Sequence, residues 1–295
     1  MQEVILKTKG SSFRIKEAYK SLRTNVEFCG EDVKVIAITS CTPNEGKSSV
    51  SMGLAQAFAE AGKKTLLVDA DLRKSVLVSR YRTGQIRYGL VHFLVGQRKA
   101  EEVFCKTDFP SLFVVFAGPV PPNPSELMGG SKFTRFLEDA RKIFDFIIVD
   151  TPPLGSVIDA AVIATKCDGT VMVIENNAVS YRFAQNVKEQ LDRSGCRILG
   201  AVLNKVDMSS GGHYGTYGRY YGRYYGRYYG KYYGNYGEYG NLPDSSLDKN
   251  TNSDVKDRTD TKKKSGKAGK NVKASAASNM NDHPEVEMID LNKDE

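Results

Sequence analysis

Residues 33–62 read VKVIAITSCTPNEGKSSVSMGLAQAFAEAG, and this stretch decides the fold. Its first part, residues 33–38, is apolar and rich in β-branched side chains, which predicts a buried strand of a parallel sheet. Residues 48–61 predict a helix that ends at Gly62. A loop between a strand and a helix start presents backbone N–H groups at the positive end of the helix dipole. The sequence therefore predicts an anion-binding loop.

The loop offers the groups that hold a nucleoside triphosphate. It consists of Pro43, Asn44, Glu45, Gly46, Lys47, Ser48 and Ser49. We expect Lys47 to reach the β- and γ-phosphates and the Ser48 hydroxyl to bind Mg²⁺. The consensus GxxxxGK[ST] is met only in part, because Cys41 stands where its first glycine belongs. A chance Gly-Lys-Ser is the alternative, and the predicted strand and helix on either side argue against it.

Aspartates follow two further predicted strands. Asp69 and Asp71 come after residues 65–68, and Asp150 comes after residues 146–149. Ligands of parallel sheets bind outside the carboxyl ends of the strands, so we expect all three acids beside the loop. Asp69 and Asp150 are the predicted metal ligands in addition to the serine. For Asp150 the alternative is a strand-end residue that caps a turn.

A nucleotide-binding protein needs only one acid at this position to hold its metal, so the second carboxylate of the Asp69–Asp71 pair indicates a further role. A tyrosine hydroxyl has a pKa of about 10, so a nearby carboxylate helps by orienting or deprotonating it. We therefore expect the catalytic residues to be Lys47, Asp69, Asp71 and Arg73. Arg73 has two interpretations of about equal weight, stabilisation of a transferring phosphoryl group or a surface ion pair.

The remaining pattern alternates strands with helices. Strands are predicted at 33–38, 65–68, 112–116, 146–149, 170–174 and 198–203. Helices are predicted at 14–28, 48–61, 125–142, 157–165 and 181–193, with a proline-rich loop at 119–124. This alternation predicts an α/β fold of the P-loop NTPase type, a mostly parallel sheet with helices on both faces.

The composition changes abruptly after Met208. A tyrosine- and glycine-rich segment at 208–240 precedes a polar tail at 241–295, and both are predicted to be disordered because they cannot bury enough apolar surface. The tyrosines of the first segment are Tyr214, Tyr217, Tyr220, Tyr221, Tyr224, Tyr225, Tyr228, Tyr229, Tyr232, Tyr233, Tyr236 and Tyr239. A flexible chain can present many phenols in turn to one site, so the sequence suggests an enzyme that carries its own phosphoacceptors. The folded domain is predicted to be residues 1–207.

Composition narrows the class of protein. The net charge of +7 is not concentrated in one basic block, and the five cysteines are scattered without a CxxC spacing. A disulfide framework or a structural metal site is therefore not expected, and a reducing cytosol fits. No run of eighteen apolar residues and no secretory signal occurs, so we expect any membrane role to come through a partner.

The motifs together resemble the bacterial tyrosine kinase family that regulates capsular and exopolysaccharide synthesis, over roughly residues 11–240. The phosphate loop is similar to the family's Walker A motif, residues 66–73 to its Walker A′ motif and residues 146–150 to its Walker B motif. The tyrosine run resembles its C-terminal autophosphorylation cluster. Gly118 and residues 122–127 also resemble a family segment.

The resemblance implies a P-loop α/β fold, Mg-ATP as the phosphoryl donor and autophosphorylation of the tyrosine cluster. The family's oligomerisation helix carries an ExxRxxR pattern, which corresponds here to Glu17, Lys20 and Arg23 within about 14–28. The resemblance thus implies a homo-oligomeric ring. Its assembly is expected to be weaker because lysine lacks the bidentate fork of arginine. The alternative is a solvated, charged helix face.

The family's two-chain form implies the partners. They are a separate transmembrane activator, a protein-tyrosine phosphatase and further protein substrates, with no nucleic acid. The expected location is cytoplasmic, with recruitment by the partner to the inner face of the cell membrane.

Two rival functions remain open. A MinD/ParA-like ATPase switch without kinase activity shares the fold, but such proteins carry a second lysine early in the loop, where Cys41 and Thr42 stand here. A nucleic-acid-binding module is the second rival, because interleaved Tyr, Gly and Arg can stack on bases and track phosphates. That interpretation leaves the nucleotide loop unexplained.

Overall fold

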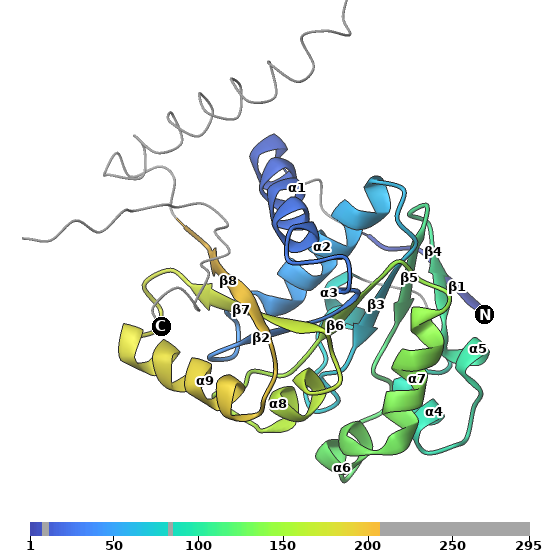
Figure 1. Cartoon of the computed structure of the whole chain (residues 1–295). Helices are drawn as coiled ribbons and strands as arrows, with labels where there is room; N and C mark the ends of the chain where they lie inside the picture. Colours follow the sequence, from blue (N-terminus) through green and yellow to red (C-terminus); the bar gives the residue numbers. More distant parts are fainter. Residues whose placement is uncertain (8–11, 82–84, 207–295) are drawn as a thin grey trace, which may run out of the picture. The chain divides into compact units, whose positions relative to one another are not determined.

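The computed structural model describes residues 1–7, 12–81 and 85–206, and within these ranges an eight-stranded sheet forms the centre (Figure 1). The strands are β1 (Gln2–Val4), β2 (Val35–Ser40), β3 (Thr65–Asp69), β4 (Cys105–Thr107), β5 (Leu112–Val115), β6 (Phe146–Asp150), β7 (Gly169–Glu175) and β8 (Ile198–Asn204). Their order is β1-β4-β5-β3-β6-β2-β7-β8. Only β4 and β5 pair antiparallel among the described strands.

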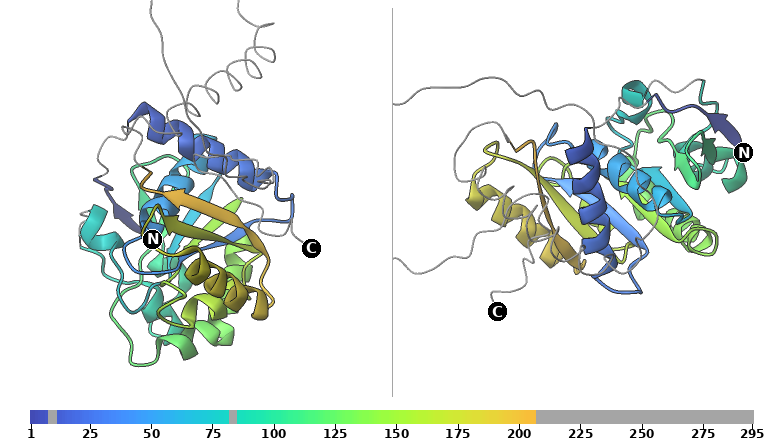
Figure 2. Two further views of the ribbon diagram at one scale, coloured as in Figure 1. Left: turned by 90° about the vertical axis from the view of Figure 1, so that its left-hand side faces the viewer. Right: turned by 90° about the horizontal axis from the view of Figure 1, so that it is seen from above.

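Helices cover both faces of this sheet (Figures 1 and 2). They are α1 (Phe13–Glu27), α2 (Lys47–Glu60), α3 (Leu77–Tyr81), α4 (Leu90–Leu94), α5 (Ala100–Val103), α6 (Pro124–Gly129), α7 (Ser131–Arg141), α8 (Asp159–Ala164) and α9 (Tyr181–Arg193). On one face α2 packs against β2, β3 and β6, and α1 packs against α2. On the other face α7 contacts β6 and α8 contacts β2. The predicted fold class is confirmed.

The central strand β2 shows why the sheet needs both layers. Ile36 and Ile38 join the hydrophobic cluster that includes α1 and α2, whereas Val35 and Ala37 join the clusters on the opposite face. All four side chains are fully buried. Successive residues of a strand point to opposite faces, so an unbroken apolar run requires a cover on each side.

One ion pair fixes the start of β2. Asp168 accepts hydrogen bonds from the backbone N–H groups of Lys34 and Val35, at 2.9 and 2.7 Å, and from both terminal nitrogens of Arg141. Burial acts to raise the pKa of Asp168, but the bonds from Arg141 and the two N–H groups outweigh it and lower the pKa. The carboxylate therefore joins α7, β2 and the segment before β7.

One predicted helix is wrong. The segment predicted as a single helix at 125–142 forms α6 and α7, separated at Gly130. Gly130 has an extended backbone (φ −69°, ψ 160°) and serves as the C-cap of one helix and the N-cap of the next. The short edge strand β1 and its neighbour β4 were not predicted, because three residues are too few for an alternating pattern to stand out.

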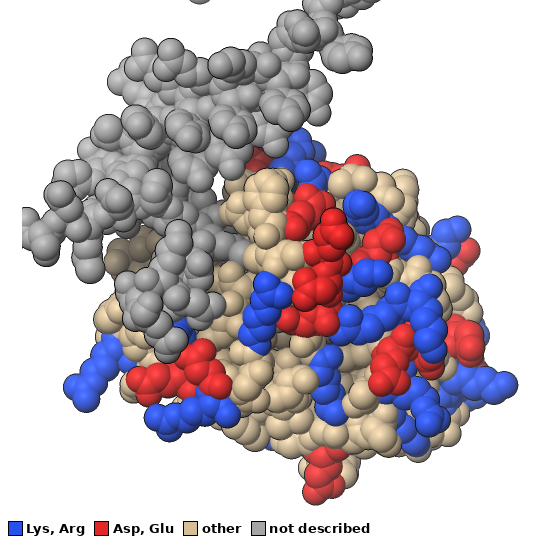
Figure 3. All heavy atoms as spheres, in the orientation of Figure 1, with Lys and Arg blue, Asp and Glu red and all other residues tan. Residues whose placement is uncertain are grey.

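Several predictions fall outside the described residues. They concern the tyrosine cluster at 208–240 and the polar tail at 241–295. Within the described ranges no helix has both the length and the apolar content needed to cross a bilayer. On the face shown in Figure 3, Lys and Arg are interspersed with Asp and Glu, so charge of one sign does not dominate there.

Candidate active site

The loop between β2 and α2 has the backbone of a phosphate-binding loop. Asn44 and Gly46 adopt positive φ values of 71° and 96° before α2 begins at Lys47. A Cβ atom on Gly46 would lie 2.1 Å from the Asn204 side-chain nitrogen. Glycine is therefore required there twice, for its left-handed backbone and for the close approach of a neighbouring strand.

Asn204, the last residue of β8, and the following Lys205 hold this loop in place. The Asn204 amide donates to the Glu45 carbonyl at 2.8 Å, and Lys205 Nζ donates to the Asn44 carbonyl at 2.7 Å. Lys205 also pairs with Glu175 at 2.8 Å. Sequence reasoning missed Asn204 and Lys205. The available signal was their position at the carboxyl end of a strand, the edge of the sheet where ligands bind.

Glu45 supports the loop from within. Its carboxylate is buried and accepts hydrogen bonds from both the backbone N–H and the hydroxyl of Thr42. The glutamate side chain thus closes the loop on itself. Its contribution to a bound anion is restricted to its backbone.

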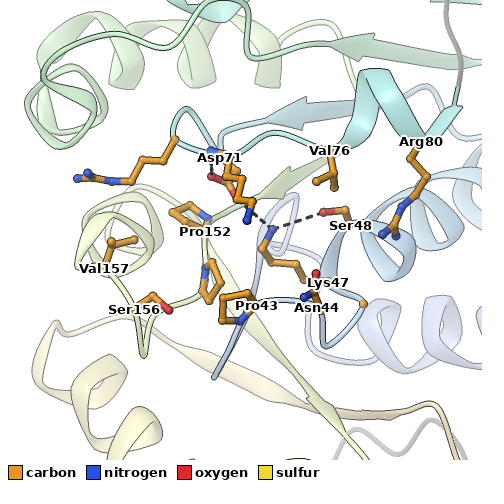
Figure 4. Close-up of a pocket in the computed structure, with 14 residues that line it drawn as sticks. Pro43, Asn44, Lys47, Ser48, Asp71, Val76, Arg80, Pro152, Ser156 and Val157 are labelled. Atoms are coloured by element: carbon orange, nitrogen blue, oxygen red, sulfur yellow. Dashed lines mark hydrogen bonds and ion pairs between the residues drawn. The ribbon is translucent and has the colours of Figure 1, made fainter.

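Lys47 lies at the centre of the site. Its ammonium is 3.1 Å from an oxygen of Asp71 and 3.4 Å from the Ser48 hydroxyl, as the dashed lines in Figure 4 show. Lys47 and Asp71 are only 8% and 4% exposed. Asp71 also accepts from the Lys74 backbone N–H at 3.0 Å. The structure therefore brings together the predicted lysine, the predicted serine and one predicted acid.

Asp69 and Asp150 lie directly beside each other, as register partners at the ends of β3 and β6. Burial, then the charge of Asp150, raises the pKa of Asp69 to about 7, although a hydrogen bond from Ser75 acts in the opposite direction. The second oxygen of Asp69, Oδ1, is buried without a hydrogen bond of standard geometry. An under-satisfied buried carboxylate is a strained arrangement that a positive ligand would relieve.

Asp150 is anchored by a residue that the sequence analysis did not identify. The Ser51 hydroxyl bridges Asp150 at 3.0 Å and the Lys47 carbonyl at 2.9 Å. Burial raises the pKa of Asp150, opposed by Lys47 and by hydrogen bonds from Ser48 and Ser51. Ser51 follows Lys47 by four residues on α2, so helical spacing alone places it on the same face.

Arg73 is held at the edge of the site. Its Nε and Nη2 donate to the two carboxylate oxygens of Asp159, at 2.7 and 3.0 Å, and Nη2 also donates to Ser125 at 3.0 Å. Burial acts to raise the pKa of Asp159, but hydrogen bonds from Arg73 and Ser125 lower it. Of the two interpretations of Arg73, the ion pair is present in the structure.

A cleft opens over the loop. The phosphate loop and Asp71 line one part of it, and Pro152, Pro153, Ser156 and Val157 line another. Arg73, Lys74, Val76 and Arg80 line the remaining part, from the segment that leads into and forms α3. Figure 4 shows Arg80 across the cleft from Pro152 and Val157.

The predicted oligomerisation residues lie on α1. Glu17 and Lys20 form an exposed ion pair at 2.7 Å, and Arg23 donates to the Ala57 carbonyl of α2 at 3.2 Å. The Tyr19 hydroxyl donates to the Ser49 carbonyl at 3.1 Å, and so contacts the phosphate loop directly. Oligomerisation by these residues stays a prediction.

The residues fit a magnesium nucleotide. The helix start, Lys47 and Ser48 provide anion and metal contacts, and Asp69 provides a buried carboxylate oxygen without a hydrogen bond of standard geometry. No group of three or more His, Cys, Asp or Glu in the described part of the chain could hold a metal ion by itself. Magnesium sites commonly use one or two carboxylates together with substrate phosphates and water, so this finding agrees with the proposed ligands.

Comparison with known proteins identifies the family. A family model described as an AAA domain matches residues 33–193. The tyrosine-protein kinase CpsD of Streptococcus agalactiae is 44% identical over 209 residues, which cover 70% of this chain and 91% of the relative. The chain belongs to the bacterial tyrosine kinase family. Tyrosine-protein kinase YwqD of Bacillus subtilis is 36% identical over 219 residues, covering 74% of this chain and 92% of the relative. The predicted family is confirmed.

Solved structures, among them a tyrosine kinase domain, share the fold. The chimerical protein CapA2B2 has a TM-score of 0.63 and 30% identity, covering 70% of this chain and 94% of that chain. The kinase domain of the Escherichia coli tyrosine kinase Etk has a TM-score of 0.62 and 32% identity, covering 68% and 78%. The cell-division ATPase MinD of Pyrococcus furiosus also matches, with a TM-score of 0.52 and 26% identity over 60% of this chain and 74% of that chain. The fold alone therefore does not separate a kinase from a MinD-like ATPase, whereas the higher identity to tyrosine kinases does.

Proposed function

We propose that this bacterial tyrosine kinase transfers the terminal phosphoryl group of Mg-ATP to tyrosines of its own C-terminal cluster, and so regulates capsular or exopolysaccharide synthesis and export. The observation that carries the proposal is the position of Lys47. Lys47 begins α2, and its ammonium lies 3.1 Å from a carboxylate oxygen of Asp71. Asp69 and Asp150 lie at the ends of the neighbouring strands β3 and β6. A nucleotide-binding lysine is thereby combined with an additional carboxylate.

Each residue has a proposed role. Backbone N–H groups at the start of α2 and the Lys47 ammonium bind the phosphates, and Ser48, Asp69 and Asp150 hold the metal. Asp71 orients an incoming tyrosine hydroxyl and accepts its proton on a carboxylate oxygen. Bound Mg-ATP supplies the phosphoryl group and the cation that offsets its charge. The protein itself contributes positioning and charge, from the largely buried side chains of Lys47 and Asp71.

The acceptors are proposed to be the twelve tyrosines between Tyr214 and Tyr239. In this arrangement residues 1–207 form the catalytic domain, 208–240 the acceptor segment and 241–295 a polar tail. The relatives support specificity for tyrosine, because CpsD and YwqD are tyrosine-protein kinases. Phosphorylation would reverse the charge of this segment, because it contains Arg219, Arg223 and Arg227 and each phosphate adds about −1.5 to −2 charge.

The partners follow from the family's two-chain form. We propose a transmembrane activator that recruits the chain to the inner face of the membrane, a homo-oligomer formed through α1, a tyrosine phosphatase and further protein substrates. Glu17 and Lys20 support the second of these, because both are exposed on α1 and remain accessible to another copy. Charge reversal at both positions should lower the mass of the assembly measured by light scattering.

The function is tested by incubating the full chain with Mg-ATP and the cytoplasmic segment of its activator. Mass spectrometry should find phosphotyrosine within 208–240, and the Lys47→Met variant should show none. ATP hydrolysis with every tyrosine unmodified would instead support the MinD-like ATPase switch. Equal phosphorylation of the variant and the natural chain would also overturn the proposal.

A further inference from the structure

The cleft has more cationic side chains than the predicted nucleotide site accounts for. Besides Lys47, its lining includes Arg73, Lys74 and Arg80, and Asp71 is the one carboxylate that lines it within the described residues. A concave surface with this balance attracts an anion. The two arginines differ in what their guanidinium groups contact, and this difference assigns them different roles.

The Arg73 guanidinium is held in an ion pair with Asp159. The guanidinium binds both oxygens of Asp159, whose side chain is only 3% exposed. Moving the arginine to a ligand would leave this buried carboxylate unpaired, which is a costly arrangement. Arg73 therefore maintains the shape of the cleft edge, and its fork is already occupied.

Arg80 has most of its hydrogen-bonding capacity left. It lies on α3, is exposed, and donates from Nη1 to the Ser49 hydroxyl. It forms no ion pair within the described part of the chain. A guanidinium has five N–H donors in a fixed fork, so one bond to Ser49 orients the group and leaves the others available.

The position of Arg80 suits a phosphoryl group over the loop. Ser49 belongs to the first turn of α2, next to the Ser48 and Lys47 side chains that face the cleft. Figure 4 shows the Arg80 side chain directed from α3 toward this turn, on the same side as Ser48. Arginine is well matched to phosphate because its fork binds two oxygens at once.

We propose that Arg80 is a phosphoryl-binding residue on the α3 side of the cleft, a role that rests on the proposed kinase function. The group it binds is a phosphate dianion, which has two sources in this reaction. One is the terminal phosphate of the nucleotide, and the other is the phosphate of a modified tyrosine before it leaves. Ser49 orients the guanidinium for either one.

The test compares binding rather than turnover. Calorimetry on the full chain should measure the dissociation constants of Mg-ATP, Mg-ADP and a phosphotyrosine peptide copied from residues 220–227, for the natural chain, Arg80→Ala and Arg80→Lys. We expect Arg80→Ala to weaken at least one of the phosphoryl ligands about ten- to a hundredfold, because a charge-assisted contact is lost. The dissociation constants of Arg80→Lys should lie between those of the natural chain and Arg80→Ala, since lysine keeps the positive charge but lacks the two-pronged guanidinium. Arg193→Ala, an exposed α9 arginine paired with Glu189, is the matched control and should change each value less than about twofold.

The pattern of losses distinguishes the two sources. If Arg80→Ala weakens the binding of Mg-ATP more than the binding of Mg-ADP, Arg80 contacts the terminal phosphate of the nucleotide. If the variant weakens only the binding of the peptide, Arg80 contacts the phosphate of the modified tyrosine. A weaker dependence of the affected dissociation constant on salt concentration should accompany either result, because one ionic contact has been removed. Unchanged affinities for all three ligands in Arg80→Ala, with an unchanged melting temperature, would overturn the assignment. Binding of Mg-ATP by a natural chain that phosphorylates no tyrosine would contradict the proposed function and still leave the Arg80 measurement valid.

Discussion

Substitution of Asp69 by Asn should stabilise the free protein, and the gain should grow with pH. The physical reason is that Asp69 is fully buried beside Asp150, so that its ionised form is disfavoured. Its pKa is raised from 3.8 to about 7 in the folded chain, chiefly by burial and then by the Asp150 charge. Asparagine keeps the size of the side chain and its ability to accept the Ser75 hydrogen bond, but it has no charge.

The sign follows from proton binding. Below about pH 4 the carboxyl is protonated in both the folded and the unfolded chain, so it contributes no pH dependence. Between about pH 4 and pH 7 only the folded chain retains the proton, so the free energy of unfolding falls as pH rises. Above about pH 7 both forms are ionised and the loss is complete. At about 1.4 kcal/mol per pH unit the upper limit is about 4 kcal/mol, of which roughly 2–3 kcal/mol arises between about pH 5 and pH 8.

The assay is urea unfolding, followed by circular dichroism, without nucleotide or magnesium. The difference in unfolding free energy between Asp69→Asn and the natural chain should increase between pH 5 and pH 8. Asp168→Asn is the matched control of opposite sign, because the pKa of Asp168 is lowered by Arg141 and by two backbone N–H groups. That variant should be less stable than the natural chain at neutral pH, and its deficit should shrink as pH falls through the acidic range. A difference for Asp69→Asn that is constant with pH would refute the reasoning.

Three further predictions concern other parts of the structure. Gly46→Ala should weaken Mg-ATP binding at least about tenfold in calorimetry, because the new Cβ would lie 2.1 Å from Asn204 Nδ2 at a φ of 96°; unchanged affinity would mean that the loop readily adopts another shape. Phe136→Ala should lower the unfolding free energy by about 3–5 kcal/mol, since this fully packed ring stacks with Phe104, and urea titration measures the loss; a loss under about 1 kcal/mol would contradict the packing. Arg73→Ala should lower the melting temperature, because the buried Asp159 carboxylate loses its ion pair. The double variant with Asp159→Ala should regain part of the lost melting temperature. If the decreases of the two single variants simply add in the double variant, the two side chains are not coupled.

Local sequence was sufficient for the central part of the fold. The apolar runs that became β2, β3, β6, β7 and β8 were recognised because strands covered on both faces cannot alternate with polar residues. The helix predicted at 125–142 failed because Gly130 breaks an amphipathic pattern that continues on both sides of it. The edge strand β1 pairs with β4 across about a hundred residues of chain, a contact that no local pattern contains.

The sequence by itself determined the kind of chemistry. A strand, a loop with Gly46-Lys47-Ser48 and a helix in that order create an anion site through main-chain geometry, which depends only on neighbours in the chain. It also placed Asp69, Asp71 and Asp150 at strand ends, and parallel pairing required that these ends meet.

Only the tertiary structure decided how these groups are used. It showed that Lys47 pairs with Asp71, that Asp69 is crowded against Asp150, and that Asn204 and Lys205 support the loop from a strand more than 150 residues away in the chain. It also separated Arg73, bound to Asp159, from Arg80, which keeps donors for a ligand. These differences arise from burial and from distances between segments remote in sequence, and residue order alone specifies neither.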